Sequence, residues 1–91
     1  EYTYLGIVGD KNEEGLCNIE QRNKFSVGET IEVMKPDGQN IEVTVKRIVD
    51  ENGKDMESCP HPKQNLYIDL GIKLDKYDIL RRQEEETEVN S

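Results

Sequence analysis

Short alternations of apolar and polar residues, separated by turn sequences, constrain the fold of this chain more than any other feature. In Leu16 to Gln21, Cys17 and Ile19 occupy alternate positions, and Thr30 to Met34 repeats the pattern. A period of two places apolar side chains on one side of a β-strand. No stretch of ten residues shows the 3.6-residue period of an amphipathic helix, so we expect an all-β fold.

Three further segments have the composition or alternation of strands: Tyr2 to Val8, Ile41 to Val45 and Leu66 to Leu70. Pro36-Asp37-Gly38 and Asn52-Gly53 are typical turn sequences, because Pro fixes φ and Gly accepts positive φ. Short strands joined by such turns indicate a barrel or a sandwich.

After Val45 the alternation changes phase, because Lys46-Arg47 is followed by Ile48-Val49 one position out of step. A slip of one residue is typical of a β-bulge, which bends a strand at the corner of a barrel. We therefore expect a bulge at Lys46-Arg47.

The chain has 91 residues and a formal net charge of −8. Residues 83–91 carry four glutamates and no basic side chain, so we expect a disordered acidic tail after a single domain at residues 1–82. That domain is itself negative, which disfavours direct binding to RNA. No apolar run approaches the ~20 residues that cross a bilayer, so we expect no membrane insertion and no membrane partner.

Cys17 and Cys59 are too few for a disulfide framework. One alternative is a single disulfide between them. The interpretation we favour is two reduced, partly buried thiols of a cytoplasmic protein. A metal site that combines both thiols with His61 and a carboxylate is conceivable. Pro60 and Pro62 favour a rigid loop instead, and we expect no metal and no cofactor.

The basic residues form three short groups, Arg22 with Lys24, Lys46-Arg47, and Arg81-Arg82. Brought together, they would form a patch able to bind carboxylates or phosphates. Scattered, solvated charges are the simpler interpretation.

Two segments resemble the translation-factor type of β-barrel. Val27 to Val33 resembles the strand that opens such barrels, and Lys76 to Leu80 resembles the closing segment, with Tyr77 where Gly is common. The resemblance implies a small closed β-barrel of about six or seven strands.

A second resemblance covers about eighty residues of the chain. The chain resembles the C-terminal domain of the collagenase-like peptidases (peptidase family U, number thirty-two). The segments that carry it are Tyr4 to Val8, Ile19 to Glu29, Ile31 to Gly38, Pro60 to Gln64 and Asp78 to Arg82. The order of Arg-Asn-x-Phe-x-x-Gly, His-Pro-x-Gln and Ile-Leu-Arg-Arg is specific as a set.

This resemblance implies an accessory module and not a complete enzyme. Family members place a catalytic portion, similar to a TIM-type barrel, before such a domain, and the first residue here is Glu1, so we expect a part of a longer protein. Members are described as peptidases that act on collagen-like substrates, and relatives are linked to hydroxylation of RNA bases and to iron–sulfur clusters. The cluster cysteines belong to the catalytic portion and are not transferred to Cys17 or Cys59.

We therefore predict a non-catalytic domain that packs beside the catalytic portion of the same chain and helps bind or position a protein or peptide substrate. An RNA-docking module of an RNA-hydroxylation enzyme is the alternative. Arginines would bind acidic groups, the Phe would anchor, and the His and Gln would supply hydrogen bonds. The structural alternatives are that Phe25 fills the core or an interface and that Asn23 and Gln64 satisfy backbone groups in turns. The residues chosen are Arg22, Asn23, Phe25, His61, Gln64, Arg81 and Arg82.

Overall fold

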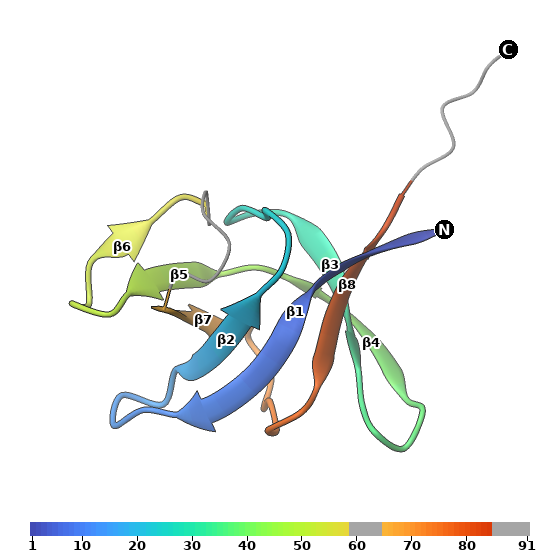
Figure 1. The fold of residues 1–91 in the computed structure, drawn as a ribbon, viewed down its shortest axis with the longest axis horizontal. Helices are drawn as coiled ribbons and strands as arrows, with labels where there is room; N and C mark the ends of the chain where they lie inside the picture. The colour runs from blue at the N-terminus through green and yellow to red at the C-terminus, as the bar shows by residue number, and fades with distance from the viewer. Residues whose placement is uncertain (59–64, 85–91) are drawn as a thin grey trace, which may run out of the picture.

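The computed structural model describes residues 1–58 and 65–84 of the chain. These residues form eight strands, which are β1 (Tyr2–Lys11), β2 (Cys17–Gln21), β3 (Thr30–Met34), β4 (Asn40–Thr44), β5 (Arg47–Asp50), β6 (Asp55–Met56), β7 (Asn65–Asp69) and β8 (Ile79–Gln83). They pair antiparallel in the order β4-β3-β8-β1-β2-β7-β5-β6, as one strongly curled sheet (Figure 1). The all-β prediction is confirmed. None of the described residues forms a helix that could cross a membrane.

The connection between β2 and β3 ties the two ends of the curled sheet together. Gly28 N donates to the carbonyl oxygen of Val45, just after β4, at 2.8 Å. Val27 N donates to the carbonyl oxygen of Glu57, just after β6, at 2.8 Å. The described sheet has eight strands where six or seven were expected. Its two edge strands, β4 and β6, are linked through this connection and are not paired with each other.

Both predicted turns form hairpins with a glycine in the left-handed region. Gly38 has φ 94° between β3 and β4, and Gly53 has φ 84° between β5 and β6. The Asp50 carboxylate accepts hydrogen bonds from the backbone nitrogens of Asn52 and Lys54, at 2.8 and 2.9 Å. This Asx-type bonding holds the β5–β6 turn.

The phase slip at Lys46-Arg47 marks a change of pairing partner and not a bulge within one strand. β4 ends at Thr44 and pairs with β3, whereas β5 begins at Arg47 and pairs with β7 and β6. The register irregularities lie in β1 instead, between Tyr4 and Gly6 and between Val8 and Lys11. A phase change in a sequence does not distinguish a bulge from a corner, because both insert a residue that is out of step.

The concave side of the sheet holds the core. The side chains buried there most completely are Leu5, Val8, Ile19, Phe25, Ile31, Val33, Val45, Ile48, Leu66, Ile68 and Leu80. β8 runs through Gln83, and Glu84 N donates to the carbonyl oxygen of Glu1 at 3.0 Å, so regular structure continues past residue 82. The rest of the predicted acidic tail, residues 85–91, lies outside the described residues.

Candidate functional site

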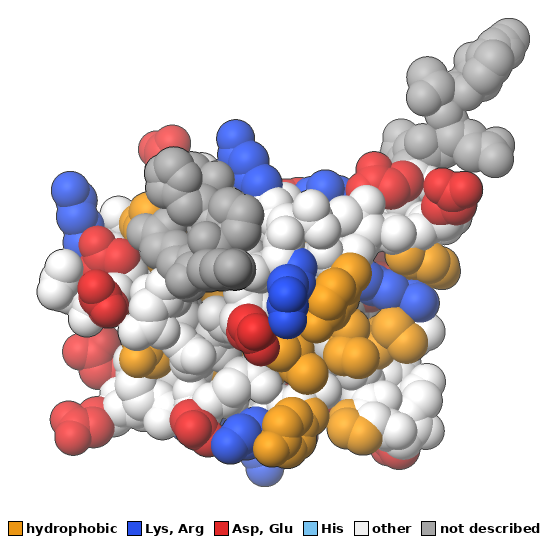
Figure 2. Space-filling view, viewed as in Figure 1, with side chains coloured by type: hydrophobic (Ala, Val, Ile, Leu, Met, Phe, Trp, Pro, Cys, Tyr) orange, Lys and Arg blue, Asp and Glu red, His pale blue; other side chains and the backbone are white. Residues whose placement is uncertain are grey.

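Exposed apolar side chains gather on the outer face of β1 and β8. Among the described residues, five large hydrophobic side chains are exposed, and four belong to these strands or to the turn before β8: Tyr77 at 63%, Tyr2 at 50%, Tyr4 at 42% and Ile79 at 37%. Figure 2 shows orange side chains clustered over this part of the molecule. Single exposed apolar residues are ordinary, but a cluster of them marks a contact surface.

Strand register explains why these residues share one face. In antiparallel pairs, directly opposed residues point to the same side of the sheet. Ile7 on β1 opposes Ile79 on β8, and Tyr4 opposes Arg81. Tyr77 N donates to the carbonyl oxygen of Val8 at 2.8 Å, so the turn before β8 lies beside the Ile7 end. We call the set Tyr2, Tyr4, Ile7, Tyr77 and Ile79 the tyrosine face.

Arg81 lies within this face and is occupied by partners of the domain itself. Its guanidinium carbon lies 3.5 Å from the centroid of the Tyr2 ring, and Nε donates to the Glu32 carboxylate at 2.8 Å. The ion pair is largely shielded, with side-chain exposures of 18% and 22%. A stacked and paired arginine fixes the orientation of the neighbouring tyrosine.

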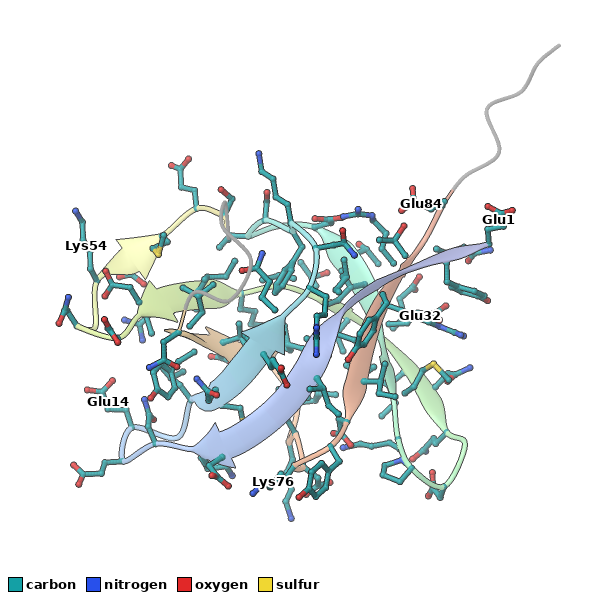
Figure 3. All side chains as sticks on the ribbon, viewed as in Figure 1. Glu1, Glu14, Glu32, Lys54, Lys76 and Glu84 are labelled. Carbon is teal, nitrogen blue, oxygen red and sulfur yellow. The ribbon has the colours of Figure 1, made fainter. Side chains whose placement is uncertain are left out.

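An acidic groove of about 500 Å³ borders the end of the face where the described chain begins and ends. Its acidic lining residues are Glu1, Glu32, Glu42 and Glu84. Figure 3 shows Glu1, Glu32 and Glu84 on one side of the molecule, with Lys76 at the opposite end of β8. This end of the face repels phosphate and favours a basic partner.

Arg82, the next residue along, points away from Arg81, because successive side chains of a strand alternate. It donates to the carboxylates of Glu29 at 2.5 Å and Glu84 at 3.0 Å. The hydrogen bonds to Glu29 and then Glu84 raise the pKa of Arg82. The Thr3 hydroxyl and Arg82 lower the pKa of the Glu84 carboxyl. Arg81 and Arg82 therefore bind separate sets of carboxylates and do not form one basic patch.

The other predicted site residues are dispersed. Arg22 is exposed and pairs with exposed Glu20 at 3.1 Å. Asn23 Nδ2 donates to the carbonyl oxygen of Tyr4 at 2.7 Å, so it fixes backbone next to the tyrosine face. Phe25 is 1% exposed and packs in the core, where it offers no surface to a partner. The remaining two predicted residues, His61 and Gln64, lie outside the described residues.

The turn before β8 is stabilised by a partly buried ion cluster. Asp78 is 0% exposed, and its Oδ2 accepts from Lys35 Nζ at 2.6 Å and from Asp75 N at 2.8 Å. Lys35 Nζ also pairs with Asp75 at 3.1 Å. The hydrogen bond to Asp78, and then that to Asp75, raises the pKa of Lys35, while Lys35 lowers the pKa of the Asp75 carboxyl.

The described residues offer no site for an iron–sulfur cluster or another metal. Among them, no group of three His, Cys, Asp or Glu side chains is placed to hold an ion. Cys17 is buried, and desolvation raises the pKa of its thiol, which disfavours the thiolate that metals bind. Cys59 lies outside the described residues.

The comparisons with known proteins agree with this architecture. Residues 1–81 match the family model of the peptidase family U32 C-terminal domain. The chain belongs to this family. Two crystal structures of the C-terminal domain of a Geobacillus thermoleovorans protein assigned as a U32 peptidase are similar to it, both with a TM-score of 0.75. The selenomethionine variant is 28% identical and the other structure is 27% identical, covering 87% and 91% of this chain and 98% and 93% of theirs.

One relative has a name that refers to RNA chemistry. The tRNA hydroxylation protein P1 of Bacillus subtilis (strain 168) is 28% identical over 82 residues, which cover 89% of this chain. The match covers 19% of the relative, so this chain spans about a fifth of its length. The family was predicted from the sequence, but the tyrosine face was not. Tyr2 and Tyr4 alternate with Thr3 and Leu5, so they had to share one side of their strand.

Proposed function

We propose that this U32 domain is a non-catalytic accessory module, and that it packs through the tyrosine face against the catalytic portion of the same cytoplasmic polypeptide. The concentration of four exposed apolar side chains on one face supports this role. Docked in this way, the domain orients the catalytic portion toward its substrate. Tyrosines are well suited to such a contact, since each combines a large apolar surface with a polar hydroxyl.

The length of the relative supports the catalytic portion as the partner. A C-terminal domain that amounts to a fifth of a relative's length follows a much larger portion. β1 carries three residues of the face and is the first strand of the domain, so the face lies on the strand nearest to what precedes it. Covalent connection supplies a high effective concentration, so a contact of modest area is sufficient.

RNA is the substrate class that the name of the Bacillus relative supports for the whole protein. We infer that this domain acts on such a substrate indirectly. Each of the four arginines of the chain already binds a carboxylate of the domain, in the pairs Arg22–Glu20, Arg47–Asp55, Arg81–Glu32 and Arg82–Glu29. A phosphate would have to displace these carboxylates, in a domain that is negative overall.

Deletion of the domain from the full-length protein tests this role, with tRNA hydroxylation and peptide cleavage assayed in parallel. We expect KM to rise, or activity to fall, for one substrate class while the catalytic portion stays folded. Unchanged kinetics for both classes would overturn the positioning role. The catalytic portion's own thermal transition serves as the folding control.

Direct RNA docking is the second candidate, favoured by the relative's name and opposed by charge. It predicts that Arg22→Gln in the full-length protein lowers the slope of log affinity against log salt concentration by about one phosphate contact. Arg47→Gln, on β5, is the matched control, because Arg47 is also exposed and paired with one carboxylate. Equal slopes for both variants and the wild type would exclude a phosphate contact at Arg22.

A further inference from the structure

Tyr77 has an unusual backbone conformation for its residue type. Its φ is 79°, and it is the only residue other than glycine in the described ranges with positive φ. A bulky side chain is strained in the left-handed region, where glycine is comfortable. Tyr77 is also the most exposed of the large hydrophobic residues, at 63%. Intramolecular packing therefore does not account for a tyrosine at this position.

The surrounding turn fixes this conformation from several directions. Tyr77 N donates to the carbonyl oxygen of Val8, and Val8 N donates to that of Asp78, both at 2.8 Å. The Asp78 carboxylate is anchored by Lys35, as described above. The exposed ring therefore projects from a backbone whose position is set before any partner arrives, which lowers the entropy lost on binding.

Resting on the docking role proposed above, we propose that Tyr77 is the preformed anchor of the tyrosine face and inserts into an apolar pocket of the catalytic portion. Anchor residues of interfaces are typically aromatic side chains held in their bound orientation. Tyr77 continues the face beyond Ile79, and Lys76 lies 5.4 Å from its ring centroid while paired with Asp10 at 3.2 Å. The acidic groove lies at the opposite end of β8, away from the anchor.

Tyr77→Gly in the full-length protein separates anchoring from folding. Glycine accepts the turn's φ, so the domain should keep or gain thermal stability. Docking should weaken by about tenfold, as expected for loss of an interface anchor. Radical footprinting of tyrosines measures docking: Tyr2 and Tyr4 should be protected in the wild type and become reactive in the variant. Tyr67, on β7, is the internal control.

Tyr77→Gly adds backbone freedom as well as removing the ring, so two further variants separate these effects. Tyr77→Asn retains a residue that tolerates left-handed φ but lacks the ring, and it should behave like Tyr77→Gly. Tyr77→Phe keeps the ring and should retain protection of Tyr2 and Tyr4.

The outcomes distinguish the two proposals. Docking through this face would be overturned if Tyr2 and Tyr4 of the wild-type full-length protein react as freely as their exposure in the domain implies. The anchor role alone would be overturned if Tyr2 and Tyr4 are protected in the wild type and remain protected in both Tyr77→Gly and Tyr77→Asn. Docking through the face would then stand.

Discussion

Two turns of this domain both require a residue with positive φ, and different residues occupy that position. The β5–β6 turn places Gly53 at φ 84°, and the turn before β8 places Tyr77 at φ 79°. In both, an aspartate carboxylate accepts hydrogen bonds from the backbone of the turn, Asp50 in the first and Asp78 in the second. The first aspartate is bonded at the surface, whereas the second is 0% exposed and paired with Lys35.

The difference shows how much support a strained side chain requires. At Gly53 there is no side chain, nothing lies within 4 Å of where one would begin, and an exposed Asx turn suffices. At Tyr77 the turn is supported by a buried ion pair and by reciprocal hydrogen bonds with Val8. The Tyr77 turn has this additional support and the Gly53 turn does not, which points to a function for the Tyr77 side chain.

The largest difference between the turns should come from removing their aspartates. Asp78→Ala removes the closest partner of the largely shielded Lys35 ammonium and leaves Asp75 as its ion-pair partner, so we expect a loss of about 1.5–3 kcal/mol. Asp50→Ala removes hydrogen bonds that water can replace at the surface, at about 1 kcal/mol. Urea unfolding of the two variants measures both free energies. Equal losses would show that the buried cluster does not support its turn more strongly.

Replacing the residue with left-handed φ should change the free energy of unfolding in opposite directions in the two turns. Gly53→Ala introduces strain of about 1–2 kcal/mol, partly offset by reduced freedom of the unfolded chain, and so should destabilise by about 0.5–1 kcal/mol. Tyr77→Gly relieves the same strain and should stabilise by about 0.5 kcal/mol. Thermal unfolding of both variants resolves the signs. A loss of stability in Tyr77→Gly would mean that the ring supports the domain itself.

The sequence predicted most of the fold because its signals are local. Alternation placed the longer strands, and Asn52-Gly53 and Pro36-Asp37-Gly38 specified their hairpins. The two-residue strand β6 was missed, since two residues cannot show a period. Tyr77 stands where Gly is common in the translation-factor type of barrel, and its φ of 79° accounts for that preference, but the left-handed conformation was not predicted.

The candidate site was harder to predict because it depends on pairings between distant strands. Arg81 and Arg82 are adjacent in the sequence, yet Arg81 binds Glu32 and Arg82 binds Glu29. Neither acidic partner is identifiable before the register of β3 and β8 is known. Phe25 was predicted as an anchor, with core or interface filler as the alternative, and it lies in the core. A lone aromatic in a sequence does not reveal which side of the domain it faces.

The last contrast concerns alkaline stability, which only the turn before β8 should influence. The folded-state pKa of Lys35 is raised by Asp78 and Asp75, so its stabilising contribution is complete below the unfolded-state pKa of about 10.4 and is lost as pH rises through the folded-state value. Lys35→Met should therefore abolish part of the stability loss above about pH 10.4. Lys54→Met, in the β5–β6 turn, is the matched control for the loss of one lysine. A difference in slope between the two variants isolates the contribution of the Lys35 cluster. Identical slopes would show that the cluster holds the turn by geometry and not by charge.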